Sequence, residues 1–369
     1  MSRKAKSIKV IAMLACLVLL VSACGTAATT TAAATAPTTT APTTAATTSA
    51  TTAATSSTTS ATTEPAGAET VRIAALKGPT GIGMVKLMED AAGQKTKDKY
   101  TFSLAAAPDD LVAKLSSGEV DIAALPTNLA ATLYQKTNGR IKMLAINTLG
   151  VLYILENGDT VKSVADLKGK KIAATGQGAT PEYAINVVLK DAGIDPAGAV
   201  TYMAEHAELA TLAIADKEKL IMLPEPFVTT VLSKAPQFRI AINLTEAFAS
   251  ALSKVDGSEK AELAQGCIAV RAEFAEKNPE AIKNFLSAYE ASTKWVNENV
   301  TEAGELTVKH NIMADAKLAA KAIPNCNIIY IDGADMKPVL EPLLKILFEA
   351  KPQSVGGKLP DDNFYYQVG

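Results

Sequence analysis

The fold of this chain is decided by the stretch Val71-Arg-Ile-Ala-Ala-Leu-Lys-Gly-Pro-Thr-Gly-Ile-Gly-Met-Val-Lys-Leu-Met-Glu-Asp90. Its first residues predict a short apolar strand, and Gly78-Pro79-Thr80-Gly81 predicts a turn that ends it. Apolar residues then recur at helical spacing from Ile82 to Met88. The turn should therefore lie at a helix N-terminus, where unpaired N–H groups and the helix dipole attract an anion or another hydrogen-bond acceptor.

A second unit of the same kind is Lys171-Ile-Ala-Ala-Thr-Gly-Gln-Gly-Ala-Thr-Pro-Glu-Tyr-Ala-Ile-Asn-Val-Val-Leu-Lys-Asp-Ala-Gly193. Thr180 suits the N-cap of its helix, and Pro181 suits the first helical position. Taken alone, each unit could be an ordinary strand-to-helix turn. Two of them, one domain-length apart, suggest two similar lobes that each offer a helix N-terminus to one cleft.

Predicted strands and helices alternate along the body of the chain, which favours parallel α/β lobes. The expected strands are 71–75, 101–106, 121–125, 142–147, 151–155, 171–175, 199–203, 219–223 and 238–243. The expected helices are 82–88, 109–116, a helix ending at Tyr134, 181–192, 207–216, 226–234, 279–299 and 336–349. The apolar stripe from Ile282 to Trp295 in the long helix is expected to be core.

The first 24 residues predict a lipoprotein signal. Arg3, Lys4, Lys6 and Lys9 give a positive start, an apolar run follows, and Val21-Ser-Ala-Cys24 resembles the bacterial lipobox. That resemblance implies that Cys24 becomes the diacylated first residue of the mature protein, with a fatty-acyl group such as palmitate. The alternatives are an ordinary secretory signal or a single membrane helix, for which the apolar run is short.

Residues 25–68 predict a disordered tether. From Thr26 to Thr63 every residue is Thr, Ala, Ser or Pro. The segment therefore has no large apolar side chains whose burial could offset the conformational entropy lost on ordering. A flexible chain of this length would span on the order of 35 Å. We expect it to hold a soluble body near the membrane that anchors it.

Composition argues against a nucleic-acid partner. The whole chain has a formal net charge of −2, and aromatic residues are only 5% of it. Removing the four positive charges of the signal leaves −6 for the remainder. No basic stripe interleaved with aromatic residues is present.

Two of the four cysteines belong to the signal, and the other two are Cys267 and Cys326. In an exported protein they could form a disulfide, or they could be two buried free thiols. Their spacing makes a poor metal site, and we expect no metal and no cofactor.

The body resembles the substrate-binding proteins of ABC importers, in the group that includes the nitrate, sulfonate, taurine and thiamine-pyrimidine-precursor binders. Each matching segment is weak alone, but their order is specific, and together they extend over residues 70–369. The segments are Gly118-Glu-Val-Asp-Ile-Ala-Ala124, Asp166-Leu-Lys-Gly-Lys-Lys-Ile172, Met222-Leu-Pro-Glu-Pro-Phe227, Arg271-Ala-Glu-Phe-Ala-Glu-Lys-Asn-Pro-Glu280 and Gly357-Lys-Leu-Pro-Asp-Asp-Asn-Phe-Tyr365.

This resemblance implies an α/β, two-lobed type II periplasmic-binding-protein fold, with a ligand cleft between lobes joined by two crossing strands. Lobe one would comprise residues 70–150 and 267–369, and lobe two residues 155–262. The crossings would lie near 150–155 and 264–270.

The sequence offers little for catalysis. It has two histidines, His206 and His310, and no HExxH, GxSxG or Walker motif. The GxG at Gly176 lacks the third glycine of a dinucleotide fingerprint, because Pro181 stands there. His310 is expected at the surface, and His206 either contacts a ligand or faces solvent.

Ligand-binding residues are expected at the turns that follow the strands, where open α/β sheets bind their ligands. Their backbone N–H groups and small polar side chains suit a polar or anionic head group. In lobe one they are Gly78, Pro79, Thr80, Gly81, Thr127, Asn128 and Thr148, and in lobe two Gly176, Gln177, Gly178, Ala179, Thr180 and Glu225. Glu225 could instead cap the helix that follows it, or meet an amine on the ligand.

The expected function is therefore capture of a small polar or anionic organic solute of the sulfonate, nitrate or pyrimidine-precursor type. A monomeric, lipid-anchored binding protein on the extracytoplasmic side would deliver it to the permease subunits of an ABC importer. No enzyme activity is expected. The alternatives are a same-fold enzyme of the pyrimidine-precursor or menaquinone type, which export disfavours, and a ligand-sensing lipoprotein.

Overall fold

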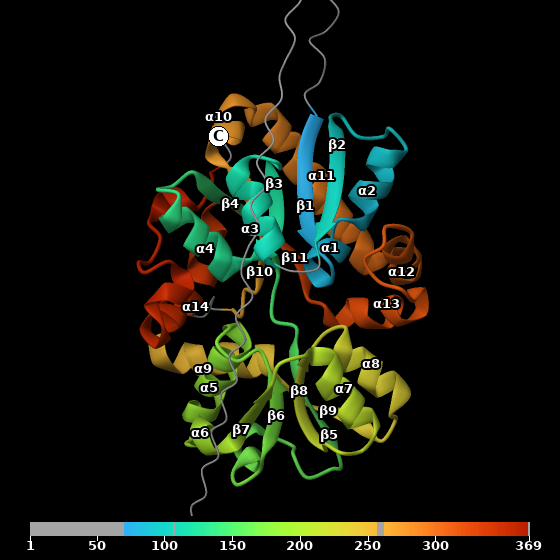
Figure 1. The fold of residues 1–369 in the computed structure, drawn as a ribbon, viewed down its shortest axis with the longest axis vertical. Helices are drawn as coiled ribbons and strands as arrows, with labels where there is room; N and C mark the ends of the chain where they lie inside the picture. Colours follow the sequence, from blue (N-terminus) through green and yellow to red (C-terminus); the bar gives the residue numbers. More distant parts are fainter. Residues whose placement is uncertain (1–69, 106–107, 257–261, 368–369) are drawn as a thin grey trace, which may run out of the picture. The chain divides into compact units, whose positions relative to one another are not determined.

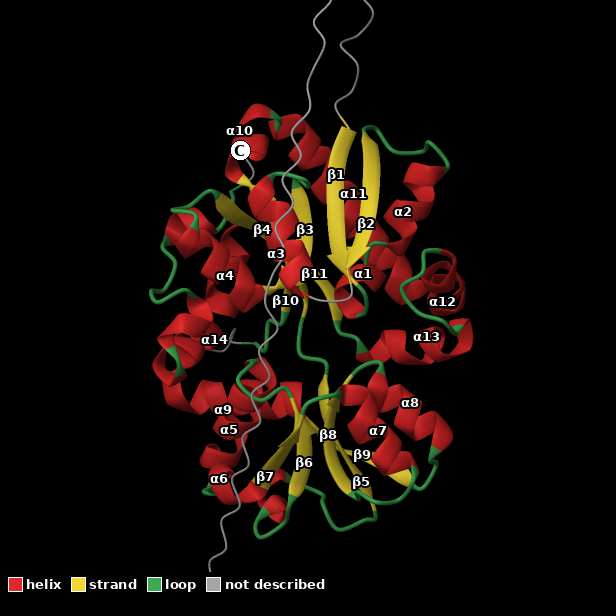
Figure 2. Cartoon of the chain, in the orientation of Figure 1, coloured by secondary structure: helices red, strands yellow, loops and turns green. Residues whose placement is uncertain are grey.

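The computed structural model describes residues 70–105, 108–256 and 262–367. They form two sheets, each covered by helices, and we call each sheet with its helices a lobe (Figures 1 and 2). The expected lipoprotein signal with Cys24 and the whole of the expected tether, residues 25–68, lie outside the described residues.

Lobe one contains a six-stranded sheet in the order β11-β4-β10-β3-β1-β2. β1 pairs in parallel with β2 and β3, whereas β10 is antiparallel to β3 and β4, and β11 is antiparallel to β4. The strands are β1 (Thr70–Leu76), β2 (Lys99–Ala105), β3 (Ile122–Pro126), β4 (Ile141–Thr148), β10 (Gly266–Arg271) and β11 (Ile328–Asp332).

The helices of lobe one come from both ends of the described chain. They are α1 (Pro79–Ile82), α2 (Val85–Ala92), α3 (Pro108–Ser117), α4 (Thr127–Lys136), α10 (Ala272–Lys277), α11 (Pro279–Glu298), α12 (Val300–Lys309), α13 (Ala316–Ala322) and α14 (Met336–Ala350). The predicted apolar stripe of α11 is confirmed as core, because Ile282, Phe285 and Tyr289 pack in one cluster with Val71 and Ile73 of β1.

Lobe two contains a five-stranded sheet in the order β7-β6-β8-β5-β9. β6 pairs in parallel with β7 and β8, and β5 is antiparallel to β8 and β9. The strands are β5 (Leu152–Asn157), β6 (Ile172–Thr175), β7 (Val200–Met203), β8 (Leu220–Pro224) and β9 (Phe238–Asn243). The helices are α5 (Thr180–Asp191), α6 (Pro196–Ala199), α7 (His206–Ile214), α8 (Phe227–Lys234) and α9 (Leu244–Asp256).

The prediction of parallel lobes is right only in part. The chain passes from β4 of one sheet to β5 of the other through residues 149–151, and it re-enters the first sheet at β10. A strand that enters a sheet from the other lobe starts at the edge where the parallel strands end. It must therefore run against them, which is what β5 and β10 do.

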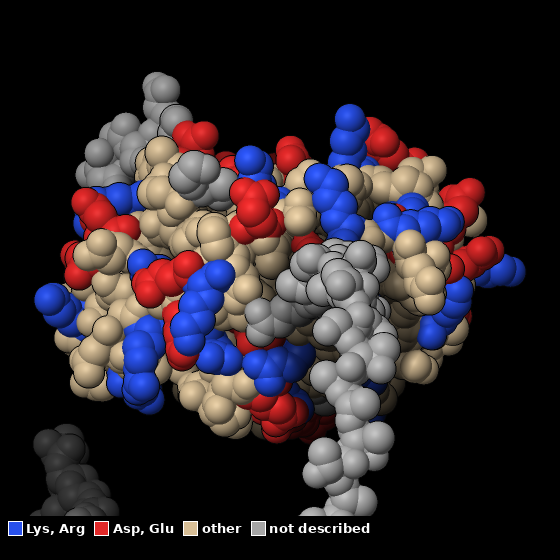
Figure 3. Space-filling view, turned by 90° about the horizontal axis from the view of Figure 1, so that it is seen from above, with Lys and Arg blue, Asp and Glu red and all other residues tan. Residues whose placement is uncertain are grey.

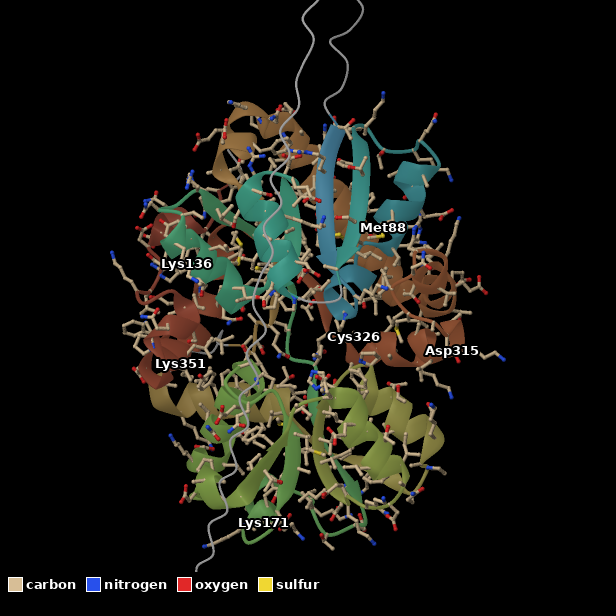
Figure 4. The ribbon with its side chains drawn as sticks, viewed as in Figure 1. Met88, Lys136, Lys171, Asp315, Cys326 and Lys351 are labelled. Atoms are coloured by element: carbon tan, nitrogen blue, oxygen red, sulfur yellow. The ribbon has the colours of Figure 1, made fainter. Side chains whose placement is uncertain are left out.

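Cys267 and Cys326 are free and buried, so the alternative of two thiols holds and the suggested disulfide is not present. The Cys267 thiol donates to the Leu125 carbonyl oxygen across the β10–β3 pair. Cys326 lies on the segment between α13 and β11 (Figure 4). Burial raises the pKa of both thiols, which makes them poor nucleophiles.

Charge on the described surface is mixed. On the face seen in Figure 3, lysine and arginine side chains alternate with aspartate and glutamate, without a continuous field of one sign. Within residues 70–105, 108–256 and 262–367, no helix is long and apolar enough to span a bilayer.

Candidate functional site

The predicted turns of lobe one lie at one edge of its sheet. Strand register places Gly266, the first residue of β10, opposite both Pro126 and Thr148. A Cβ on Gly266 would lie 2.6 Å from Asn147 Oδ1, 2.7 Å from Thr80 Cγ2 and 3.0 Å from Thr148 Cβ. The structure therefore brings together two predicted residues, Thr80 and Thr148, with Asn147 and Gly266, which the sequence analysis did not select.

Three predicted side chains of this edge already use their donors within the protein. The buried Thr127 hydroxyl donates to the Ala264 carbonyl oxygen at 2.7 Å, and the Thr148 hydroxyl donates to Asn147 Oδ1 at 3.2 Å. The Asn128 amide donates to the Ser354 carbonyl oxygen at 3.4 Å. These contacts tie the edge to the returning chain and to the C-terminal segment.

The first glycine turn opens a shorter helix than expected. The helix predicted over residues 82–88 is divided into α1, which has four residues, and α2, which begins at Val85. The break occurs where Ser292 of α11 donates to the Gly83 carbonyl oxygen and accepts from the Leu87 N–H. Because so short a helix has a small dipole, the turn attracts an anion less than predicted. Gly78, at φ +107°, is the residue there whose missing Cβ faces open space.

The second glycine turn lies where β6 ends, and its helix starts at Thr180. Ala179 is the N-cap residue, so the prediction of Thr180 as the N-cap is wrong, and Pro181 follows as the second helical residue. The Gly178 N–H donates to the Glu182 carboxylate at 2.6 Å. The helix thus supplies its own anion to the turn, which competes with a purely anionic ligand.

Gln177 lies at a different part of lobe two from the Thr175–His206 pair. It lines a cavity of about 380 Å³ together with Glu182, Asn186 and Tyr202. The other residues of that cavity are Lys190, Asp195, Pro196, Ala197 and Val200.

His206 and Thr175 form a polar pair at the edge where β6 ends. The Thr175 hydroxyl and His206 Nδ1 lie 2.6 Å apart, and the imidazole is 5.4 Å from the Phe227 ring between centroids. Burial lowers the pKa of His206, which keeps the ring neutral at physiological pH. The sequence analysis considered His206 and missed Thr175, although the last residue of a parallel strand is a position from which it could have been found.

Glu225 caps the helix that follows it. Its carboxylate accepts from the Thr229 N–H at 3.1 Å and from the Thr229 hydroxyl at 2.9 Å, at the start of α8. It is 3% exposed, and no lysine or arginine of the described residues lies within ion-pair distance of it. Burial raises its pKa to about 7, against hydrogen bonds from Thr229 and Asn325.

Hydrogen bonds join the two lobes beside Glu225. The Tyr153 hydroxyl of lobe two donates to the Asn325 carbonyl oxygen of lobe one at 3.0 Å. The Asn327 amide donates to the Gly150 carbonyl oxygen in the first crossing segment. Glu225 itself donates its N–H to the Val151 carbonyl oxygen at 2.9 Å. A substitution of Glu225, or a change in its charge, is therefore expected to affect the junction of the lobes.

The described residues hold no group of three or more His, Cys, Asp or Glu side chains placed to bind a metal ion. His310, expected at the surface, is partly buried, with Nε2 at 3.3 Å from Glu89 Oε2. It lies at the end of α12 and not at either polar edge.

The Gly266→Ala variant is expected to lose about 1–2 kcal/mol of unfolding free energy, because a methyl group must enter a filled space. The atoms it would meet are Asn147 Oδ1 and Thr80 Cγ2, both closer than 3 Å. Urea denaturation measures the loss. Gly198→Ala is the control, since its Cβ would meet no atom within 4 Å, and its change should stay below about 1 kcal/mol. Equal stability of the two variants would show that the space around Gly266 is not filled.

Residues 106–303 match the family model described as NMT1/THI5 like. No curated protein matches the chain in a direct search.

Solved structures resemble the chain over most of its length. A structure titled as an ABC transporter from Parabacteroides distasonis is 25% identical, with a TM-score of 0.69, and the match covers 81% of this chain and 99% of that one. The periplasmic aliphatic sulphonate-binding protein SsuA of Escherichia coli is 14% identical, with a TM-score of 0.63 and coverage of 81% and 92%. The alkanesulfonate-binding protein SsuA of Xanthomonas axonopodis pv. citri, bound to MOPS, is 14% identical, with a TM-score of 0.56 and coverage of 80% and 96%.

Proposed function

Because this chain belongs to the NMT1/THI5-like family and has a two-lobed periplasmic-binding-protein fold, we propose that it captures a small polar or anionic organic solute and delivers it to an ABC importer. Two of its structural neighbours are named as sulfonate-binding proteins, which supports a sulfonate or a similar solute as the ligand.

The main support for this proposal is one observation: in both lobes, polar side chains lie at the edge of the sheet next to the segments that join the lobes. Lobe one contributes Thr80 and Thr148, and lobe two contributes Thr175 and His206. The crossing segments at the junction are accompanied by side-chain hydrogen bonds such as Tyr153 to Asn325, and α8 and α5 of lobe two contact α13 and α14 of lobe one. Such a junction suits closure of the lobes around a solute, in which binding favours one relative position of the lobes.

The polar edges of the two lobes contain carboxylates as well as hydrogen-bond donors. Glu182 occupies the second glycine turn, and Glu225 is buried beside the junction. A solute that is polar at both ends fits these edges better than a simple inorganic anion does. The ligand-binding residues that we propose are those selected from the sequence other than Gln177, which lines a different cavity, with Thr175 and His206 added.

Delivery to the importer rests on the sequence of the N-terminal region. The lipobox-like segment ending at Cys24 and the tether that follows support an acylated protein held at the membrane on its extracytoplasmic side. A monomer of this kind would present the closed, loaded state to the permease subunits.

A thermal-shift screen of the purified protein tests the proposal. The panel contains alkanesulfonates, nitrate, bicarbonate, pyrimidine precursors, flavins and amino acids. A ligand present at a hundred times its Kd should add roughly 2.7 kcal/mol to the unfolding free energy. We expect one class of solute to bind reversibly and to be recovered unchanged.

The two histidines of the chain provide a matched pair of variants for this screen. His206→Ala should weaken binding of the identified solute by about tenfold, because it removes the ring at the lobe-two edge. His310→Ala, away from both edges, should bind it as the unaltered protein does. If both variants bind equally well, the solute does not lie against His206. A solute recovered chemically changed would instead favour a same-fold enzyme, and no response to any class would favour a sensor of another signal.

A further inference from the structure

A second hollow, in lobe one, is separate from the polar edges. It has a volume of about 380 Å³ and lies between α2, the loop after it, the start of β2 and α11. In Figure 1, α2 and α11 lie beside β1 and β2, and Figure 4 labels Met88 on α2. The volume is within the range of ligand pockets. The lining residues that bear on a ligand are Lys86, Asp90, Lys95, Lys97, Tyr100 and Trp295.

The hollow has a surplus of positive charge in a chain that is negative overall. Three lysines line it against one carboxylate, Asp90, which pairs with Lys86. Within the described residues, Lys95 and Lys97 have no carboxylate within 4 Å of their amines. Lys97 makes a long contact of 3.5 Å with Asn284 Oδ1, and the nearby Asp98 carboxylate accepts from the Asn284 amide. Two ammonium groups therefore remain available for an anion.

Aromatic groups form another part of the wall. Trp295, the single tryptophan of the chain, lines the hollow with the Lys86 amine 5.6 Å from its ring centroid. Tyr100 lines it too, and its hydroxyl is buried without a hydrogen-bond partner in the structure. Because that oxygen is buried, a ligand in the hollow cannot reach it, and Trp295 is the aromatic group that such a ligand would meet. Flat aromatic faces favour a planar ring.

We propose that this hollow is a second binding site, for a small aromatic anion whose ring lies against Trp295 and whose negative group lies near Lys95 and Lys97. The site is independent of the proposed solute-binding function. It lies among α2, β2 and α11 of lobe one, whereas the proposed solute contacts involve the edges where Thr80, Thr148, Thr175 and His206 lie.

The fluorescence of Trp295 reports on this hollow alone, because the chain has no other tryptophan. The probes are benzoate, benzamide and benzylamine, which share one ring and differ in charge. We expect benzoate to change the fluorescence saturably, with a Kd at least about tenfold lower than that of benzamide, and benzylamine to give no saturable change. No saturable change with benzoate, or an equal response to all three probes, would overturn the proposal.

Two variants test the named residues. The double variant Lys95→Gln with Lys97→Gln should raise the Kd for benzoate by about tenfold, while Lys217→Gln with Lys219→Gln in lobe two should leave it unchanged. Tyr100→Phe removes a buried hydroxyl that has no partner, so the protein should fold normally and bind benzoate as the unaltered protein does. Benzoate binding that survives the lysine change would place the anion elsewhere and refute the assignment.

Discussion

Replacing Asp121 with asparagine is expected to lower the free energy of unfolding by about 2–4 kcal/mol, the largest effect that we expect of any single substitution considered for this protein. Asp121 is 2% exposed and immediately precedes β3. Its carboxylate accepts from Arg72 Nε at 2.9 Å, from Arg72 Nη2 at 2.6 Å, from the Arg72 N–H at 3.0 Å and from Arg271 Nη1 at 3.2 Å.

The asparagine would keep the size of the side chain but remove its charge, and its amide would place N–H groups against guanidinium donors. Removing one member of a buried ion pair commonly costs about 3–5 kcal/mol. The expected loss is smaller here because the Arg72 and Arg271 side chains are 43% and 24% exposed and remain partly hydrated. The bonds also join three strands of the sheet, β1, β3 and β10, so their loss weakens the whole sheet.

Urea denaturation measures this loss, and Glu273→Gln is the matched control. Glu273 also pairs with Arg271, but its side chain is 64% exposed, so its removal should change stability far less than Asp121→Asn does. If Asp121→Asn is no more harmful than Glu273→Gln, the buried carboxylate does not hold the three strands together.

Replacing Glu225 with glutamine is expected to raise the free energy of unfolding at pH 8 by about 3 kcal/mol and to leave it almost unchanged at pH 4.5. The pKa of Glu225 is about 7 in the folded protein, above its ordinary value of 4.5, because burial disfavours the charged form. Between these two values the folded state holds a proton that the unfolded state releases. The unaltered protein therefore loses stability as the pH rises from about 4.5 to about 7. The glutamine variant does not, because its side chain stays neutral.

Denaturation curves at a series of pH values, from 4.5 to 8, measure this effect as a difference between the unaltered protein and the variant. The comparison isolates Glu225, because His206 titrates equally in both proteins. Glutamine can still accept from Thr229, so the cap of α8 is retained. Glu208→Gln, an exposed glutamate of α7, should follow the unaltered protein at every pH. Parallel curves for Glu225→Gln and the unaltered protein would show that Glu225 is not the group responsible.

Local patterns in the sequence were enough to predict most elements of the fold. The strand expected at 238–243 is β9 with the same bounds, and the helix expected at 181–192 is α5 displaced by one residue. Apolar alternation, helical spacing and glycine or proline at the turns act within a few residues, so the sequence alone carries them. The same patterns placed the two glycine turns at the ends of β1 and β6.

The division of the first helix into α1 and α2 could not be predicted in this way. It depends on Ser292, which is 209 residues from Gly83 along the chain and bonds to it across the packed helices. The role of Glu225 was left open for a related reason. Its hydrogen bonds to Thr229 are local, but its burial is decided by the junction of the lobes.

The sequence by itself determined the order of most strands and of the longer helices other than α9, the position of the two glycine turns and, through ordered short motifs, the resemblance to importer binding proteins. The tertiary structure alone decided which polar groups are satisfied within the protein and which are available. Thr127 bonds to Ala264, 137 residues away, Asp121 bonds to Arg271, 150 residues away, and Cys267 and Cys326 stay apart as thiols. Such pairings depend on which strands become neighbours, and no pattern within a single segment specifies that.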